Sequence, residues 1–219
     1  AITIIATVPF GRCRSIASAA EPYPDAKALE VLSRVMLLRG SILNFSEDYE
    51  RAVRLASEAK MLKPGSTSAM MQKASALALL ANSKGDAPQH ALQDYRLVLA
   101  EFDELRRRDP TNRLWERDQA AVQLLIAEGI VACRQNKVTN CKSMPSLEEA
   151  EISSLKAIRT LRELAKSNPS NVSWQRDLGW AQQVRAKALA ARDRSNESLE
   201  ALRESERLHN ANIPDRSDA

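Results

Sequence analysis

The sequence predicts an all-α protein in which about four antiparallel helix pairs stack into a continuous α-solenoid. Its composition favours helices, since the 219 residues include only 6 glycines and show little β-branched alternation. A proline-containing phrase recurs between long helical patterns, which is typical of a repeat array. The hydrophobic share of 44% is enough to bury a core. We therefore expect an ordered array of helices.

The recurring phrase defines the boundaries between repeats. It reads DPTNRLWERD at residues 109–118 and NPSNVSWQRD at residues 168–177. A weaker copy, without the tryptophan, begins next to Pro64. The interval from Pro110 to Pro169 is longer than the interval from Pro64 to Pro110. Because proline cannot continue a helix, each copy is expected to end one helix before the next begins.

Capping signals place the individual helices. Asp86 with Gln89, and Ser146 with Glu149, have the spacing of a capping box. Asn112 is of a type favoured at an N-cap. The polar segment between the helices of the third pair accounts for the longer interval between prolines. The expected helices are 26–44, 46–62, 66–82, 86–108, 112–135 and 145–166, then one from 171 and a last one from 195 or 196.

The expected domain organisation has a lead-in, a repeat domain and a tail. Residues 1–25 contain three prolines and predict an irregular lead-in. Residues 26–210 form the repeat domain, and residues 211–219 a disordered tail. The apolar run at residues 2–10 is too short to span a bilayer, and no basic stretch precedes it as in a signal peptide. The first residue is Ala1, which predicts a trimmed chain. The start of the array offers no clean polar cap, which predicts an N-terminal neighbour. The helix pairs are expected at approximately 26–62, 66–108, 112–166 and 171–209.

The sequence offers no catalytic, cofactor or metal site, so we expect a protein that is not an enzyme. The two histidines, His90 and His209, have no cysteine or carboxylate at metal-ligand spacing. Residues 63–68 lack the strand and the Gly-Lys-Ser/Thr of a phosphate loop, so they predict a turn between helices. The three glutamates within residues 148–151 are expected at an exposed helix start, where the dipole favours their charged form. Capping explains them better than acid–base chemistry.

The three cysteines leave two alternatives. Cys13, Cys133 and Cys141 are too few for a disulfide framework, so reduced thiols are the default expectation. Cys133 and Cys141 flank a short polar stretch, however, and could close a small loop in an oxidising compartment.

The densest positive cluster comprises residues 106–108, Arg113 and Arg117. Arginines near the C-terminus of a helix complement its dipole, and this is the favoured interpretation. The alternative is a patch for an acidic peptide or a nucleic acid backbone. Nucleic acid is disfavoured, because aromatic residues are few and acidic residues are interspersed along the helices. No helix has the lysine-rich face and large exposed apolar residues of a membrane-surface helix.

One helix pair has several residues at the characteristic positions of a known repeat. Gly40 is a small residue late in the first helix, and Tyr49 opens the second. Ala52 and Ala59 recur on the inner face of the second helix, and Pro64 ends the unit. The segment from 33 to 66 therefore resembles a tetratricopeptide repeat (TPR), a short pair of antiparallel helices.

The later pairs are similar to the longer TPR-like arrays of large bacterial signalling proteins, which carry the same Asp-Pro to Arg-Asp phrase at each junction. In the segment from 33 to 66, two positions depart from the family pattern. Met36 stands where tryptophan is common, and Ala56 where a larger apolar residue is usual. The resemblance covers most of residues 30–210. It implies a right-handed superhelix and a protein-binding function, and it identifies no partner.

The tryptophans of the recurring phrase have an expected structural role. Trp115 and Trp174 open their helices, where each can pack into the junction with the preceding pair. Burying such a ring contributes roughly 2–3 kcal/mol. The Arg-Asp dipeptides at 117–118 and 176–177 are expected to form hydrogen bonds or ion pairs between units.

The expected function is a protein–protein interaction scaffold that holds a partner peptide or helix in a concave groove lined by the first helices. The alternative is a regulatory or sensory segment of a larger signalling protein, such as a kinase, Toll-like or winged-helix regulator, whose effector domain lies outside this chain. That alternative predicts self-association or intramolecular docking. A cytoplasmic location is favoured, and the extracytoplasmic side of a membrane-anchored parent is left open. The candidate groove residues are Arg34, Arg39, Gln72, Lys73, Gln123, Glu128, Gln182 and Arg185.

Overall fold

The computed structural model describes residues 25–84, 88–135 and 144–210. Within these ranges the chain is all-helical and has no β-strand, which confirms the predicted fold class. The predicted cap at Asp86, the tail and most of the lead-in lie outside the described residues. The helices are α2 (Ala26–Leu43), α3 (Ser46–Leu62), α4 (Thr67–Ser83), α5 (Pro88–Arg108), α6 (Arg113–Gln135), α7 (Leu147–Ser167), α8 (Val172–Ala190) and α9 (Ser195–Asn210).

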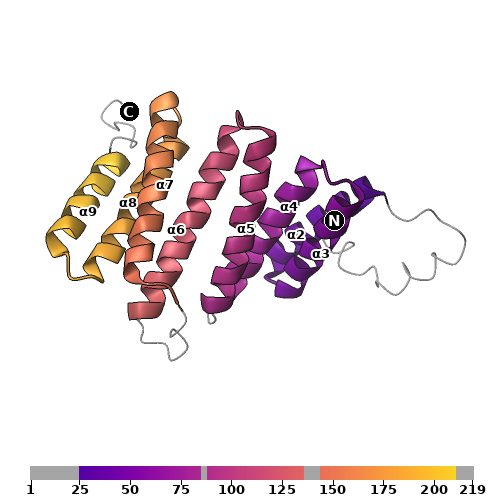
Figure 1. Ribbon diagram of the computed structural model, residues 1–219, viewed down its shortest axis with the longest axis horizontal. Helices are drawn as coiled ribbons and strands as arrows, with labels where there is room; N and C mark the ends of the chain where they lie inside the picture. Colours follow the sequence, from indigo (N-terminus) through magenta and orange to yellow (C-terminus); the bar gives the residue numbers. More distant parts are fainter. Residues whose placement is uncertain (1–24, 85–87, 136–143, 211–219) are drawn as a thin grey trace, which may run out of the picture.

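The helices form a solenoid of four pairs, α2–α3, α4–α5, α6–α7 and α8–α9. Figure 1 shows them following one another along the long axis of the molecule, from α2 and α3 at one end to α9 at the other. Each helix packs on its neighbours in sequence, and α2 also touches α4 while α6 touches α8. We call α2, α4, α6 and α8 the first layer, and α3, α5, α7 and α9 the second layer.

Side-chain caps begin several of these helices, and the predicted cap at Ser146 is among them. The Oδ1 of Asp25 accepts a hydrogen bond from the backbone N–H of Ala28, and Ser66 Oγ accepts one from Ala69. Ser146 and Asn171 cap α7 and α8 in the same way. Because the first backbone N–H groups of a helix lack partners within it, these contacts fix where each helix starts.

A further polar cap lies at the first recurring phrase. Asn112 Oδ1 accepts a hydrogen bond from the backbone N–H of Leu114, and Asp109 Oδ1 accepts bonds from the backbone and hydroxyl of Thr111. The phrase is therefore a turn whose polar side chains start α6.

The core runs through the stack, because each inner first-layer helix has two buried faces. On α4, Met70 and Leu77 belong to the large cluster shared with α5 and α6, whereas Ala69 and Ala76 pack on residues of the preceding pair α2–α3. Trp115 and Trp174 are 8% and 9% exposed and belong to the large cluster. The repeats are thus joined by continuous apolar packing.

Gly40 allows close packing within the first pair. An added Cβ at Gly40 would lie 2.7 Å from Cε1 of Tyr49 and 3.2 Å from Cβ of Asp48. Ala52, Ala56 and Ala59 on the facing side of α3 are completely buried. Small residues on both helices therefore let α2 and α3 approach each other closely.

One expectation about α7 is wrong. Glu151, expected to be exposed, is 7% exposed and pairs with Arg192 and Arg194 in the turn between α8 and α9. The packing of the next helix pair covers Glu151, and this contact is not visible in the local pattern of α7.

The default expectation of reduced thiols is also wrong for Cys133. This residue is 2% exposed and disulfide-bonded. The other two cysteines, Cys13 and Cys141, lie outside the described residues. The composition could not decide between the two alternatives, because it does not show which sulfur atoms lie close together.

Among the described residues, no helix combines the length and the apolar character that crossing a membrane requires.

Candidate interaction surface

The first-layer helices leave one face uncovered, and its residues occupy equivalent positions in successive repeats. We treat positions as equivalent when they lie equally far beyond Pro64 in α4, Pro110 in α6 and Pro169 in α8. Beyond the first residue of each helix, four such positions are exposed or half-buried in all three helices. We call this set the open stripe. Its members are Ser68, Met71, Ser75 and Asn82 on α4, Leu114, Arg117, Ala121 and Glu128 on α6, and Ser173, Arg176, Trp180 and Lys187 on α8.

Helix periodicity explains why these residues share a face. The spacings of three, four and seven residues return to nearly the same side of a helix with 3.6 residues per turn. The opposite side of each helix is buried against its neighbours. The open stripe is therefore the side of the first layer that points away from the second layer.

Trp180 gives the open stripe an aromatic centre. It is half-buried, with part of its ring packed against the core and the rest accessible. Arg176, one turn earlier, is exposed, and its guanidinium donates a hydrogen bond to Ser173 Oγ at 3.4 Å. No carboxylate among the described residues lies within ion-pair distance of Arg176. Tryptophan and arginine are the residue types that most often dominate binding energy at protein interfaces.

Ion pairs on the open stripe tie the third repeat to the fourth. Lys187 Nζ lies 2.7 Å from Glu128 Oε1, so two equivalent positions of the stripe are bonded to each other. Arg117 Nε lies 2.7 Å from Asp177 Oδ2. These pairs fix the relative position of α6 and α8.

The sequence predicted contacts between units for the Arg-Asp dipeptides at 117–118 and 176–177. Arg117 and Asp177 make such a contact, and Arg117 also lies 3.2 Å from Asp118 of its own helix. Arg176 instead bonds Ser173 of its own helix.

The environment of Arg117 shifts the protonation of its neighbours. Burial raises the pKa of Asp118, while the guanidinium of Arg117 opposes that shift. The hydrogen bond to Asp177 raises the pKa of Arg117, which stays charged. The junction between α6 and α8 thus combines a cation with a carboxylate whose pKa is raised by burial.

The structure divides the predicted groove residues into three groups. Arg34 on α2 is exposed and has the phase of the open stripe, and Glu128 is a member of it. Arg39 and Lys73 contact the second layer. Arg39 Nε donates to Asp48 Oδ2 at 2.7 Å, and Lys73 Nζ donates to Glu101 Oε1 at 2.7 Å.

The remaining predicted residues lie between helices, away from the open stripe. Gln72 and Gln182 are 7% and 4% exposed, and Gln123 and Arg185 are half-buried. The Oε1 atoms of the three glutamines and Nε of Arg185 are buried without a hydrogen-bond partner among the described residues. Unpaired buried polar atoms are costly, so these side chains are sensitive points of the first layer.

Sequence reasoning missed Trp180, Arg176 and most of the open stripe. The signal that could have found them is the constant spacing from the junction prolines, applied to every position of the first helices. A phase error of one residue moves a side chain ~100° around the helix. Gln182 and Trp180, two residues apart, therefore lie on nearly opposite sides of α8, and Gln182 is buried whereas Trp180 is accessible.

The arginine cluster at the end of α5 is already paired with acidic groups. Arg107 and Arg108 both contact Glu104, at 2.5 and 2.7 Å. Arg106 and Arg113 both contact Glu116. This distribution is consistent with the structural interpretation of the cluster.

The described residues contain no group of three or more His, Cys, Asp or Glu side chains placed to hold a metal ion. His209 lies against Gly179, and its Nδ1 is 2.8 Å from the backbone oxygen of Ser205. The structure therefore gives this histidine a packing role between α8 and α9.

Comparison of the chain with known proteins gives no assignment. No protein-family model and no curated protein matches the sequence. Its function is therefore argued from the geometry of the open stripe.

Proposed function

We propose that this protein is an interaction scaffold that binds a protein segment along the open stripe of its first layer. The observation that supports the proposal most strongly is Trp180 with Arg176. An accessible aromatic ring packed on the core lies one turn from an exposed arginine on α8, and no carboxylate of the described residues pairs with this arginine. Such a pair offers both apolar contact and charge-assisted hydrogen bonds.

The chemistry of the open stripe indicates the kind of segment that would bind. Arg176 would favour a carboxylate or another acceptor, and Trp180 an apolar side chain next to it. Met71 and Leu114 provide further apolar contacts in the earlier repeats. We therefore expect a partner segment in which acidic residues alternate with apolar ones. The segment should be long enough to cross α4, α6 and α8.

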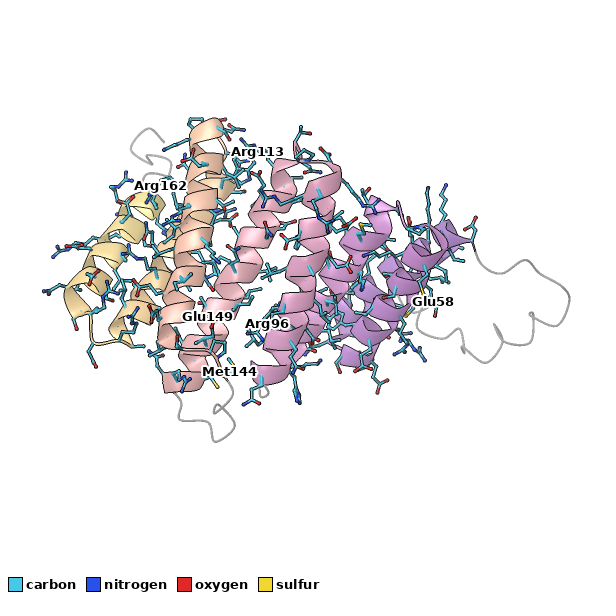
Figure 2. All side chains as sticks on the ribbon, viewed as in Figure 1. Glu58, Arg96, Arg113, Met144, Glu149 and Arg162 are labelled. Carbon is cyan, nitrogen blue, oxygen red and sulfur yellow. The ribbon has the colours of Figure 1, made fainter. Side chains whose placement is uncertain are left out.

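Photo-crosslinking tests this proposal by position. A photoreactive amino acid is placed at Ser173 on the open stripe, or at Arg96 on the second-layer helix α5 (Figure 2). Both residues are exposed, so neither substitution creates a cavity. We expect position 173 to give one discrete crosslinked product that contains a partner protein. Position 96 should give no product of the same mass.

Charge reversal then tests the role of Arg176. Arg176→Glu should weaken the crosslinked complex at least about tenfold, the loss expected for one charge-assisted bond of about 1.4 kcal/mol. Arg96→Glu has the same charge change on the second layer and should bind as the wild type does. The proposal is wrong if positions 173 and 96 capture the same species, or if both reversals leave binding unchanged.

A further inference from the structure

The outer face of α2 exposes many large apolar side chains. Val31, Val35, Leu38 and Ile42 are 57%, 41%, 59% and 75% exposed, and they lie on one side of the helix. Leu32, Leu43 and Phe45, next to this face, are also exposed. An isolated exposed leucine is ordinary, but a contiguous apolar strip on one helix indicates an interaction site.

In every later repeat the equivalent face is covered by the preceding helix pair. When Met36 of α2 is aligned with Met70 of α4, the residues equivalent to Val35, Leu38 and Ile42 are found on α4. They are Ala69, Gln72 and Ala76. The α4 counterparts are completely or almost completely buried, whereas those of α2 are open. The corresponding apolar positions of α6 and α8 are buried as well. These counterparts are Ala69, Gln72 and Ala76 on α4, Trp115 and Val122 on α6, and Trp174 and Ala181 on α8.

The spacing of the exposed residues favours another α-helix as the occupant. Val31, Val35, Leu38 and Ile42 are separated by four, three and four residues, which is the spacing of a coiled-coil seam. A helix that presents the same seam in the opposite direction is complementary to it. In that arrangement Val31 faces Ile42, Val35 faces Leu38, and the charged flank residue Arg34 lies opposite Ser41.

The other end of the solenoid does not complement this face. The accessible side of α9 includes Glu200, Arg203, Glu206 and Arg207, with Leu199 and Leu202 as its exposed large apolar residues. Head-to-tail stacking of copies would bury these charges against the apolar side chains of α2, which offer them no hydrogen-bond or ion-pair partner, and this is costly. A two-fold contact between identical apolar faces has no such penalty, and it closes after two copies.

We propose that the α2 face is a homodimer interface, in which α2 of one copy packs antiparallel on α2 of a second copy. The seam would be built from Val31, Val35, Leu38 and Ile42 of both copies. This assembly gives α2 the apolar cover that α4, α6 and α8 receive from the preceding pair. It is independent of the open stripe, because the seam residues and the open-stripe residues are different.

Sedimentation velocity of the full chain tests the proposal across a range of concentrations. The wild type should sediment as a dimer that dissociates on dilution. Val35→Glu and Leu38→Lys should each weaken the dimer at least about tenfold, because each places an unpaired charge in an apolar seam. Leu199→Glu changes a similarly exposed leucine on α9, 52% exposed, and should leave the dimer intact. Circular dichroism of each variant checks that the helices are retained.

Mixing the two seam variants tests the antiparallel register. In an equimolar mixture the glutamate at 35 of one variant faces the lysine at 38 of the other, and Leu38 faces Val35 on the other side of the two-fold axis. We therefore expect the mixture to form a heterodimer at concentrations where each variant alone has lost most of its dimer.

Three results would overturn the proposal. One is a wild type that stays monomeric at all concentrations. Another is a dimer that Val35→Glu does not weaken, which would place the interface elsewhere. The third is a monomer in which Val35→Glu makes residues 1–24 more sensitive to protease, since the chain's own N-terminal segment would then be the occupant.

Discussion

Gly40 has no side chain, and this allows α2 to pack closely against the ring of Tyr49 on α3. The ring of Tyr49 is 5% exposed and lies directly over Gly40, so a new methyl group would have to displace a packed aromatic side chain. Gly129 in α6 is a helical glycine in the opposite situation, because an added Cβ there would have no packed heavy atom within 4 Å. The two positions therefore separate steric cost from helix propensity.

Gly40→Ala should lower the free energy of unfolding by about 1–3 kcal/mol, the usual cost of forcing extra atoms into a packed contact. Gly129→Ala should raise it by about 0.5–1 kcal/mol, because alanine is the better helix former and no clash opposes it. Urea denaturation followed by circular dichroism measures both. Changes of the same sign in the two variants would contradict this account.

Glu101 is a buried carboxylate between two lysines from different helices. It is 7% exposed, and its oxygens lie 2.6 Å from Lys60 Nζ on α3 and 2.7 Å from Lys73 Nζ on α4. Burial alone would raise the pKa of Glu101, but the hydrogen bonds and charges of the two lysines lower it overall. The charged form is thus the one that the fold stabilises.

Because the pKa of Glu101 is lower in the folded than in the unfolded protein, its contribution to stability is present above the unfolded pKa of about 4.3. It is lost as the pH falls through the folded pKa. Glu101→Gln should therefore be less stable than the wild type near neutral pH, and the difference should shrink on acidification. The test is the free energy of unfolding of both proteins from about pH 7 to about pH 3. A difference that stays constant over this range would show that the charge of Glu101 is not responsible.

At the scale of helices, Glu151 connects α7 to the following pair. Its oxygens lie 2.7 and 2.9 Å from Nη1 of Arg194, and it also bonds Arg192. Arg194 in turn pairs with Glu197 in the first turn of α9. A buried carboxylate on one helix thus fixes the turn between two others.

Glu151→Ala should lower the free energy of unfolding by about 3 kcal/mol, because it removes the buried carboxylate that pairs with both Arg192 and Arg194 and leaves Arg194 with Glu197 alone. Glu148→Ala, one turn earlier and exposed, should change stability by no more than about 0.5 kcal/mol. Thermal or urea unfolding compares the two variants, and hydrogen exchange should show α9 loosened in Glu151→Ala alone. Equal effects of the two substitutions would mean that the ion pairs of Glu151 contribute little.

The helix boundaries could be predicted because their signals are local. Ser66, Ser146 and Asn171 lie within three residues of the N–H groups that they cap, and the junction prolines stop helices wherever they occur. Glu151 could not be placed, since its arginine partners lie far along the chain, beyond the whole of α8. The same limit applies to the open stripe. Which side of a first helix stays uncovered depends on how the next pair stacks, and the amphipathic pattern of one helix does not define it.

At the scale of the whole molecule, the repeats are held together by the tryptophans of the recurring phrase. Trp115 and Trp174 take equivalent positions in the two copies of the phrase, and both are buried in the cluster that spans the later pairs. In a solenoid each repeat contacts only its neighbours, so a weakened junction should affect the repeats on either side of it most.

Trp174→Ala should lower the free energy of unfolding by about 3–5 kcal/mol, through lost burial and the cavity left behind. Hydrogen exchange should accelerate in α6 to α9 more than in α2 and α3, because the affected junction is local. Leu114→Ala removes a side chain that is 59% exposed and should leave exchange nearly unchanged. Uniform acceleration along the chain after Trp174→Ala would show that the array unfolds as one unit.

The restriction of packing to neighbouring helices has a consequence for how the protein is made. Contacts that are local in sequence cost little loop-closure entropy, and chains of low contact order fold quickly. During synthesis α2 and α3 leave the ribosome before the later helices of the array, and they can pair before α9 has been translated. Each later helix pair can then pack against a preceding pair that is already folded. The apolar face of α2 is the first part of the array to reach solvent, so nascent chains on neighbouring ribosomes could meet through it while their remaining repeats are still being made.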